Sequence, residues 1–168
     1  MNAAPPMAGA SRVQRVRHEL KRRSLQVLRV QAPSPRVRRI TFSGDELADF
    51  VSLSFDDHVK LFVPASDGAA SVARDYTPRH FDTAARELSI DFALHGDGPA
   101  ARWAQQAQPG QAVMIGGPRG SFIVPPDLDW HLLVGDASAL PAVARRLEEL
   151  PAHATVFAIV QMPHGADR

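Results

Sequence analysis

The stretch Arg74-Asp-Tyr-Thr-Pro-Arg79 decides the fold, because it places a guanidinium, an aromatic ring and a hydroxyl close together along one chain segment. In an extended strand the side chains alternate between two faces, so Arg74 and Tyr76 point to one face and Asp75 and Thr77 to the other. An arginine fork suits a phosphate, and tyrosine offers a flat face with a polar tip. The pattern favours a strand that binds a flat, phosphate-bearing ligand, although an ordinary amphipathic strand would have the same residues.

Three further segments follow this strand. They are His95-Gly-Asp-Gly-Pro-Ala-Ala-Arg-Trp103, Gly116-Gly-Pro-Arg-Gly-Ser-Phe122 and Gly135-Asp-Ala-Ser-Ala-Leu-Pro141. In this order, the four segments resemble the siderophore-interacting protein family, whose members are FAD-containing ferric-siderophore reductases related to the ferredoxin-reductase superfamily. The resemblance extends from about residue 36 to about residue 160.

The composition indicates a globular chain that buries a core, with 168 residues, 45% of them hydrophobic, and a net charge of +1. Such a small net charge gives no field that would attract nucleic acid or an anionic membrane. The absence of cysteine excludes disulfides, iron–sulfur clusters and a cysteine nucleophile. No apolar run reaches the ~20 residues of a membrane helix, and residues 1–10 lack the features of a signal peptide. We therefore expect a cytoplasmic protein without a membrane partner.

Positive charge is concentrated in residues 12–39, which contain ten Lys or Arg and one acid, Glu19. One interpretation is a basic arm for nucleic acid or anionic lipid. The other is a solvated tail that leads into edge strands with charged outer faces. We favour the second, and expect no nucleic-acid partner, because no aromatic residues interleave with the basic ones.

Alternating apolar residues separated by Pro and Gly predict six short strands. These strands are expected at 25–31, 36–42, 58–64, 73–79, 87–95 and 111–116. Their number and spacing favour a six-stranded antiparallel flavin-binding β barrel. One helix is predicted at 99–107, before the sixth strand, and one short helical turn at 45–50.

After Pro125 and Pro126 the pattern changes to near-continuous apolar strands at 130–135 and 154–160. They flank a helix at 138–150, with Ser138 as its N-cap candidate. This arrangement predicts a βαβ unit in a parallel sheet, and hence an incomplete doubly wound nucleotide-binding α/β domain after the barrel.

Three regions are therefore expected along the chain. Residues 1–17 form a flexible tail, residues 18–124 an FAD-binding β-barrel domain, and residues 127–168 the start of an NAD(P)H-binding α/β domain. Because a doubly wound domain needs further strands and helices, we expect a chain that is truncated, partly disordered or naturally short.

The resemblance assigns the FAD contacts. It implies that Arg74 binds the phosphates, that Tyr76 stacks on the flavin ring and that Thr77 forms a hydrogen bond near the reactive nitrogen. Small residues at the start of the predicted helix let backbone approach the pyrophosphate, and His95, a candidate for the ribityl chain or adenine, could equally be a strand-end histidine. The expected cofactor-binding residues are Arg74, Tyr76, Thr77, Asp91, Phe92, His95, Gly98, Ala100, Ala101 and Trp103.

The sequence departs from the family pattern at two of these segments. The family usually has Ser in place of Ala101, so one hydroxyl is missing from the expected phosphate site and flavin affinity should be lower. In the last segment the family usually has Asp-Glu-Thr where this chain has Asp136, Ala137 and Ser138. We expect Gly135, Asp136 and Ser138 to contact the nicotinamide nucleotide at a helix N-terminus, although plain helix capping would explain the same residues.

Substrate residues are suggested by charge alone. Lys60 and Arg119 are the basic candidates for an anionic ferric siderophore, and surface solvation is the alternative role for each. No Gly-x-Ser-x-Gly elbow, His-Glu-x-x-His helix or P-loop occurs, and the seven histidines show no short metal-binding spacing. Iron is therefore expected as substrate, with no protein-bound metal and no side chain acting as a catalytic residue.

The resemblance implies an enzyme that takes hydride from NAD(P)H and passes single electrons through FAD to chelated Fe(III), releasing the iron. The alternative is an FAD-binding module that lacks a complete NAD(P)H site and depends on a redox partner such as ferredoxin. A basic-armed barrel that binds nucleic acid is the third and least supported interpretation.

Overall fold

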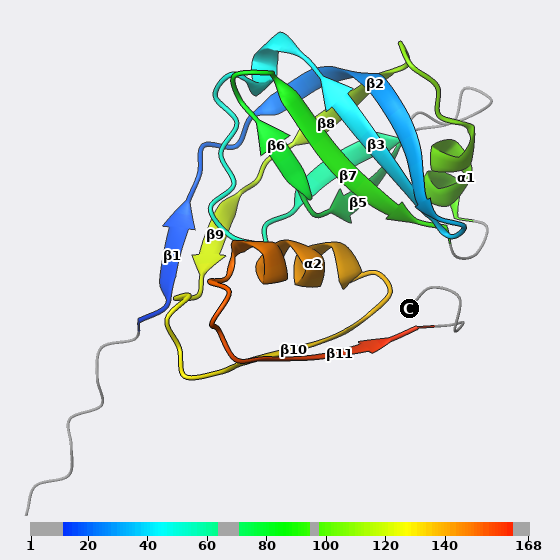
Figure 1. The fold of residues 1–168 in the computed structure, drawn as a ribbon. Helices are drawn as coiled ribbons and strands as arrows, with labels where there is room; N and C mark the ends of the chain where they lie inside the picture. The colour runs from blue at the N-terminus through cyan, green and yellow to red at the C-terminus, as the bar shows by residue number, and fades with distance from the viewer. Residues whose placement is uncertain (1–11, 64–70, 95–97, 163–168) are drawn as a thin grey trace, which may run out of the picture.

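A computed structural model describes residues 12–63, 71–94 and 98–162. A curled β-sheet body lies above a smaller layer made of one helix and two strands, and a two-stranded ribbon joins the two at one side (Figure 1). No helix in these ranges is both long and apolar enough to span a membrane.

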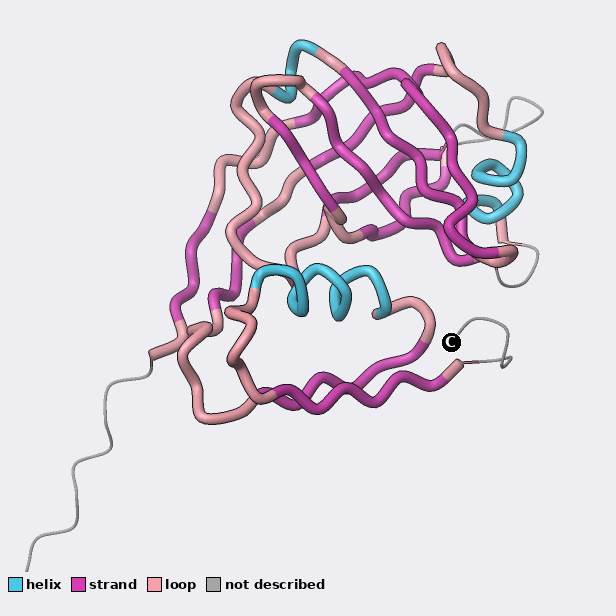
Figure 2. The backbone as a smooth tube through the Cα atoms, in the orientation of Figure 1, coloured by secondary structure: helices cyan, strands magenta, loops and turns pink. Residues whose placement is uncertain are grey.

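The body is one curled sheet of seven antiparallel strands, in the order β5–β4–β8–β2–β3–β7–β6 (Figure 2). The strands are β2 (Arg22–Ser34), β3 (Val37–Ser43), β4 (Val59–Val63), β5 (Val72–Tyr76), β6 (His80–Asp82), β7 (Glu87–Ala93) and β8 (Ala112–Gly116). The predicted antiparallel flavin-type sheet is confirmed. It has seven strands instead of six, and β5 and β6 are its two edge strands. The expected strand at 73–79 ends at Tyr76 because Pro78 cannot donate to a ladder, and β6, with three residues, was too short to predict.

Period-two alternation builds the core of this sheet. In β4, Val59, Leu61 and Val63 are buried, while Lys60 and Phe62 lie on the outer face. The inner faces of the other strands contribute the remaining large side chains of the core, among them Leu25, Val27, Ile40, Phe42, Leu88, Ile90, Phe92 and Ile115.

Two helical segments cover the ends of this core, close to where they were predicted. The helix α1 (Pro99–Gln106) buries Ala100 and Ala104, and Trp103 stacks on Phe42 with ring centroids 6.3 Å apart. The short turn η1 (Asp45–Leu47) buries Leu47.

The strand β1 (Gln14–Arg17) pairs with β9 (Gly120–Ile123) as an antiparallel ribbon. Residues 14–17 were expected in a flexible tail, and this part of the expectation is wrong. The ribbon has no apolar alternation to reveal it, since it is held by backbone pairing and by Arg15, whose guanidinium lies 5.3 Å from the centre of the Phe122 ring. Any side chain at Gly120 would collide with the carbonyl oxygen of Val16, so the close approach requires glycine there.

Much of the basic stretch is paired with acids from elsewhere in the sheet. Lys21 and Arg23 contact Asp49, Arg29 contacts Glu87, and Arg39 contacts Asp91. These charges therefore serve the fold. The second interpretation of residues 12–39 expected edge strands, but β2 and β3 are interior strands with a partner on each side.

The predicted βαβ unit is confirmed. Strand β10 (His131–Asp136) runs parallel to β11 (Val156–Gln161), with His131 opposite Val156, and helix α2 (Leu140–Glu149) connects them. One face of this two-stranded sheet exposes Leu132, Val134, Phe157 and Ile159, each more than half accessible to solvent. The other face is turned toward α2, which lies between the strands and the body (Figure 1).

Two buried arginines on α2 attach it to the body. Arg145 donates from Nη1 to Ser52 Oγ at 2.8 Å and to the carbonyl oxygen of Pro78 at 2.9 Å, and from Nε to Glu149 at 2.6 Å. Arg146 donates from Nη2 to the carbonyl oxygens of Val124 and Pro125.

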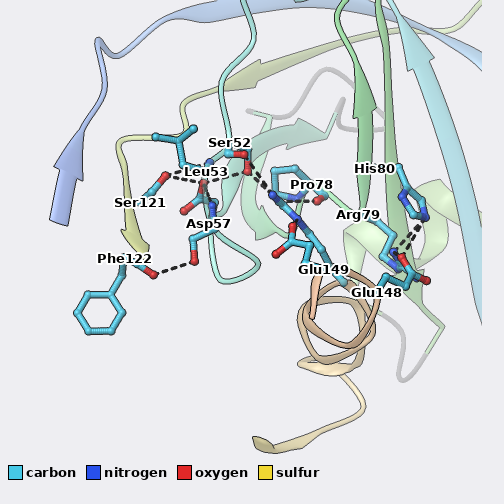
Figure 3. A network of polar contacts seen from close by, with 12 residues as sticks. Ser52, Leu53, Asp57, Pro78, Arg79, His80, Ser121, Phe122, Glu148 and Glu149 are labelled. Carbon is cyan, nitrogen blue, oxygen red and sulfur yellow. Dashed lines mark hydrogen bonds and ion pairs between the residues drawn. The ribbon is translucent and has the colours of Figure 1, made fainter. Parts of the chain in front are cut away.

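Ser52, which accepts a hydrogen bond from Arg145, is itself held in place by further hydrogen bonds. Ser52 and Ser121 both donate from their hydroxyls to Asp57 Oδ2, at 2.9 and 2.7 Å, and all three residues are buried. The network therefore connects α2, the segment before β4 and strand β9 through directional hydrogen bonds (Figure 3).

We expect Arg145→Leu to lower the free energy of unfolding by about 2–3 kcal/mol, because it leaves buried acceptors on Ser52 and Pro78 without a donor. Arg102→Leu is the matched control, since Arg102 is exposed on α1 and its loss should cost less than about 0.5 kcal/mol. Urea titration of both variants measures the difference. Equal losses would contradict a special role for Arg145.

Candidate functional site

A cavity of about 430 Å³ lies between the edge strand β5 and the start of α2. The body contributes Asp56, His58, Arg74, Asp75, Tyr76, Thr77, Asp91 and Ala93, and the βαβ unit contributes Ala137, Ser138, Ala139, Pro141 and Ala142. Five of the predicted site residues, Arg74, Tyr76, Thr77, Asp91 and Ser138, are thus brought to one place. We refer to it as the central cavity.

Tyr76 is placed by the aromatic core beneath it. Its ring lies 4.5 Å from the ring of Phe92 at an angle of 45°, and Phe92 in turn contacts Trp103 at 5.8 Å. Burial raises the pKa of the Tyr76 hydroxyl, so this group stays protonated well above neutral pH. The tyrosine therefore presents a fixed, neutral aromatic side chain at the cavity.

Phe92 does not line the cavity. It is fully buried, because it follows Asp91 in β7 and consecutive side chains of a strand point to opposite faces. Its side chain supports Tyr76 from the core and offers no surface to the cavity.

Arg74 is exposed at the cavity, where Nη1 donates to the carbonyl oxygen of its neighbour Ala73 at 2.9 Å. Asp91 is already engaged: its two oxygens accept from Nε and Nη2 of Arg39, both at 2.7 Å. Arg74 thus offers its positive charge to a ligand, while the charge of Asp91 is largely compensated.

A second cavity of about 280 Å³ continues from the first, since Asp91, Ala93, Ala137 and Pro141 line both. Its walls include the apolar side chains of Val37, Leu94, Leu140 and Met162. Arg79 also lines it, and among the residues that the structure describes, Nε of this buried arginine has no hydrogen-bond partner. This Nε lies 3.8 Å from Oδ2 of Asp91, so the extension is an apolar space with the Arg79–Asp91 ion pair in its wall.

The predicted pyrophosphate segment lies at the N-terminus of α1. Gly98 is the exposed N-cap and Pro99 occupies the first turn, with no side chain capping the helix. The backbone N–H groups of Ala100 and Ala101 belong to the helix start that lacks intrahelical partners, which favours an anion. Their methyl groups are buried, so these two residues offer backbone rather than side chains.

None of Gly98, Ala100, Ala101 and Trp103 lines the two cavities described above. Trp103 is half-buried against Phe42 and Phe92. His95 lies outside the described residues.

The loop before α2 is held by Asp136. Its Oδ1 accepts from the backbone N–H of Ser138 at 2.8 Å and from the Ser138 hydroxyl at 2.6 Å, and these bonds lower the pKa of the carboxyl. The prediction that Ser138 is the N-cap is therefore wrong. Helix α2 begins at Leu140 with Ala139 before it, and no side chain caps it. Gly135 is required because an added Cβ would lie 2.5 Å from Cβ of Ala139.

Within this loop the N–H of Ser138 is bonded to the Asp136 carboxylate, and the loop closes the central cavity. The expected contacts of Gly135, Asp136 and Ser138 with the nicotinamide nucleotide stay a prediction.

A third cavity, of about 470 Å³, is basic. It is lined by Leu20, Arg22, His58, Lys60, Phe62, Asp75, Gly116 and Arg119, so it unites the two predicted substrate candidates, Lys60 and Arg119. Arg22 was not predicted; its guanidinium lies 5.3 Å from the centre of the Phe62 ring, and only its place in a basic stretch could have pointed to it. We refer to this space as the basic cavity.

No group of three or more His, Asp or Glu within the described ranges is arranged to hold a metal ion.

Charged side chains from both units meet beside the second cavity. Arg79 binds the carboxylate of Glu148 on α2 with both Nη1 and Nη2, and Nη1 lies 3.0 Å from Nε2 of His80 (Figure 3). Burial, and then the positive charge of Arg79, lower the pKa of His80. The hydrogen bond from Arg79 lowers the pKa of Glu148.

These pKa shifts predict how acid weakens the contact between α2 and the sheet. A group whose pKa is depressed in the folded state stabilises the fold above its ordinary pKa, and that contribution is lost as the pH falls below it. His80→Gln should therefore flatten the curve of stability against pH just below 6.5, and Glu148→Gln should flatten it just below 4.5. Urea titrations across this range measure both effects.

His153→Gln is the control for this prediction, because His153 is an exposed histidine in the turn after α2. It should leave the curve unchanged. A curve of His80→Gln that overlays the parent below pH 6.5 would contradict the assignment.

The curled antiparallel sheet, with its Arg-x-Tyr-Thr edge, and the βαβ unit therefore form two parts of one fold that share a cavity. Residues 26–72 and 66–122 match the siderophore-interacting FAD-binding domain, and residues 128–168 match the siderophore-interacting protein model. The chain belongs to the siderophore-interacting protein family.

The relatives agree with this assignment. The chain is 44% identical over 154 residues to the NADPH-dependent ferric-chelate reductase of Escherichia coli (strain K12), covering 82% of this chain and 60% of that protein. It is 30% identical over 164 residues to the ferric vibriobactin reductase of Vibrio cholerae, covering 87% of this chain and 60% of that protein. The chain thus spans about 60% of the length of these curated relatives.

A solved structure has the same architecture. A siderophore utilization protein from T. fusca matches with a TM-score of 0.87 and 37% sequence identity, over 93% of this chain and 66% of that one. More distant structures support the fold alone, such as the ferredoxin reductase of carbazole 1,9a-dioxygenase with a TM-score of 0.71 and 15% identity.

Proposed function

We propose that this chain provides the FAD-binding part of an NAD(P)H-dependent reductase of ferric siderophores. The observation that carries the proposal is the central cavity, where Arg74, Tyr76 and Thr77 face the loop before α2 across one space. A reductase of this kind needs the cofactor and the hydride donor in contact, and the cavity offers one wall from each unit. The names of the two ferric-chelate reductases among the relatives support the same chemistry.

The residues of the cavity suit FAD. Arg74 would hold the phosphates, Tyr76 would stack against the flavin ring, and Thr77 would donate to it from the strand end. The uncapped start of α1 would add backbone donors at Gly98, Ala100 and Ala101, while Phe92 and Trp103 hold Tyr76 in place. FAD, when bound, supplies the conversion of a two-electron hydride into single-electron transfers.

The division of the chain follows from these roles. We propose an FAD-binding domain at residues 18–124 and the start of an NAD(P)H-binding domain at residues 127–168, where Gly135 shapes the loop and Asp136 and Ser138 hold it at the cavity. Reliance on NAD(P)H, a coenzyme of the cell interior, favours a cytoplasmic location.

The basic cavity is the proposed site of the electron acceptor. Arg22, Lys60 and Arg119 give it positive charge, which suits an anionic ferric siderophore. It shares His58 and Asp75 with the central cavity, so a chelate bound there would lie next to the flavin site. Reduction to Fe(II) weakens binding by an oxygen-rich chelator and so releases the iron.

The loop before α2 favours one alternative to direct reduction by NAD(P)H. Because Asp136 occupies a donor that a dinucleotide phosphate would use, electrons could instead come from a separate redox protein such as ferredoxin. The FAD-binding part of the proposal is the same in both cases.

Anaerobic spectroscopy tests the proposal. The purified protein should show the visible absorbance of bound FAD, lose it on addition of NADPH, and regain it when a ferric siderophore is added. A yellow protein that NADPH does not bleach, but reduced ferredoxin does, supports the alternative. A colourless protein that FAD cannot reconstitute rules out both.

Tyr76→Ala should weaken FAD binding more than Thr77→Ala does. Aromatic stacking contributes about 1 kcal/mol beyond buried area, and Tyr76 also loses its contact with Phe92, whereas one neutral hydrogen bond contributes about 1 kcal/mol or less. Fluorescence titration with FAD measures both affinities. Equal affinities would show that Tyr76 is not the stacking residue.

Arg74→Lys should also bind FAD less well, because a point charge does not reproduce the planar fork on a phosphate. Riboflavin has no phosphate and serves as the control ligand, so its affinity should change less. If titration shows the same loss for both ligands, Arg74 does not bind the phosphates.

A further inference from the structure

The strand β5 contributes to two ligand sites, because Asp75 lines both the central cavity and the basic cavity. Arg74 and Tyr76 line the central cavity, whereas Asp75 lies opposite Lys60 of β4 and extends into the basic cavity. Nζ of Lys60 donates to Oδ1 of Asp75 at 2.7 Å, with both side chains about half exposed. Lys60, a principal cation of the basic cavity, is therefore engaged by a carboxylate of its own chain.

This pair changes the charge that a ligand meets. Three basic residues, Arg22, Lys60 and Arg119, line the basic cavity together with one acid, Asp75. An anionic ligand that binds Lys60 must displace or approach the carboxylate. A neutral ligand has little electrostatic interaction with either group. The unfavourable effect of Asp75 on binding therefore grows with the negative charge of the ligand.

We propose that Asp75 is a specificity-determining residue, which reduces the preference of the basic cavity for highly anionic Fe(III) chelates by competing with them for Lys60. This inference rests on the proposed function. The site would then accept both nearly neutral ferric hydroxamates and multiply charged ferric catecholates. Its affinities for these two classes of chelate would differ less than they would if only the three basic residues lined the cavity.

Binding of redox-inert Ga(III) chelates to the FAD-loaded protein tests this inference separately from electron transfer. The two probes are a trianionic Ga(III) tris-catecholate and a neutral Ga(III) trihydroxamate, and the measurement is a calorimetric titration. Asp75→Asn should bind the trianionic probe about three- to tenfold more tightly, as expected for an exposed charge pair. Its affinity for the neutral probe should change less than about twofold.

Asp129→Asn is the matched control, because Asp129 is exposed and lines neither the central cavity nor the basic cavity. It removes the same charge and should leave both affinities within about twofold of the parent. The variants Lys60→Gln and Lys60→Gln/Asp75→Asn complete a double-mutant cycle, in which the effect of Asp75→Asn should largely disappear once Lys60 is gone. Asp75→Ser is a second variant that removes the carboxylate, with flavin absorbance as the check that each variant is folded.

The outcomes separate this inference from the proposed function. If the parent reduces ferric chelates but Asp75→Asn binds the trianionic probe no more tightly, the inference is wrong and the proposed function stands. The inference is also wrong if the double variant keeps the full gain, or if the parent binds neither Ga(III) probe. A protein that cannot be loaded with FAD overturns both.

Discussion

The buried guanidinium of Arg145 is the constraint on which the rest of the site depends. A charge in that position is tolerated only if its donors are satisfied, and here they are satisfied by Ser52, Pro78 and Glu149. Because hydrogen bonds to fixed acceptors are directional, α2 has one favourable orientation against the sheet. Pro78 directly follows Thr77, so one chain segment lines the central cavity and anchors the helix that closes it. Such a polar junction contributes orientation more than stability, which is what a site with walls from two units needs.

Local patterning revealed much of this architecture. Period-two alternation located six strands, since each buries one face, and the apolar runs around residues 131–160 indicated the βαβ unit. The cofactor residues predicted at 74–77 do line one cavity, and Thr77 reaches it because β5 ends at Tyr76, so strand alternation does not extend to Thr77. At the start of α1, proline in the first turn and the small residues after it indicated a helix N-terminus, and the structure has one there.

What the sequence concealed depends on contacts between distant residues. Arginines such as Arg145 and Arg146 are typical of the solvated face of a helix. The sequence around them does not indicate that Ser52 and Val124 lie beside them in the fold. The same holds for β1, whose pairing with β9 leaves no hydrophobic pattern, and for Arg22, which reaches the basic cavity only through the order of strands. Ser138 illustrates a competition between neighbours: its hydroxyl could cap α2 or bond Asp136, and the second arrangement is the one formed. Ala101 and Phe92 face inward for steric reasons that become visible only once the core is assembled.

The two-faced strand β5 has a consequence for how proteins of this architecture diverge. Side chains of a strand alternate strictly, so a substitution on the outer face alters what the basic cavity meets and leaves Arg74 and Tyr76 in place. An insertion or deletion of one residue would instead exchange the two faces and destroy both sites at once. The outer face of β5 can therefore change by substitution while Arg74 and Tyr76 keep their places, whereas a change in the length of the strand cannot leave them there.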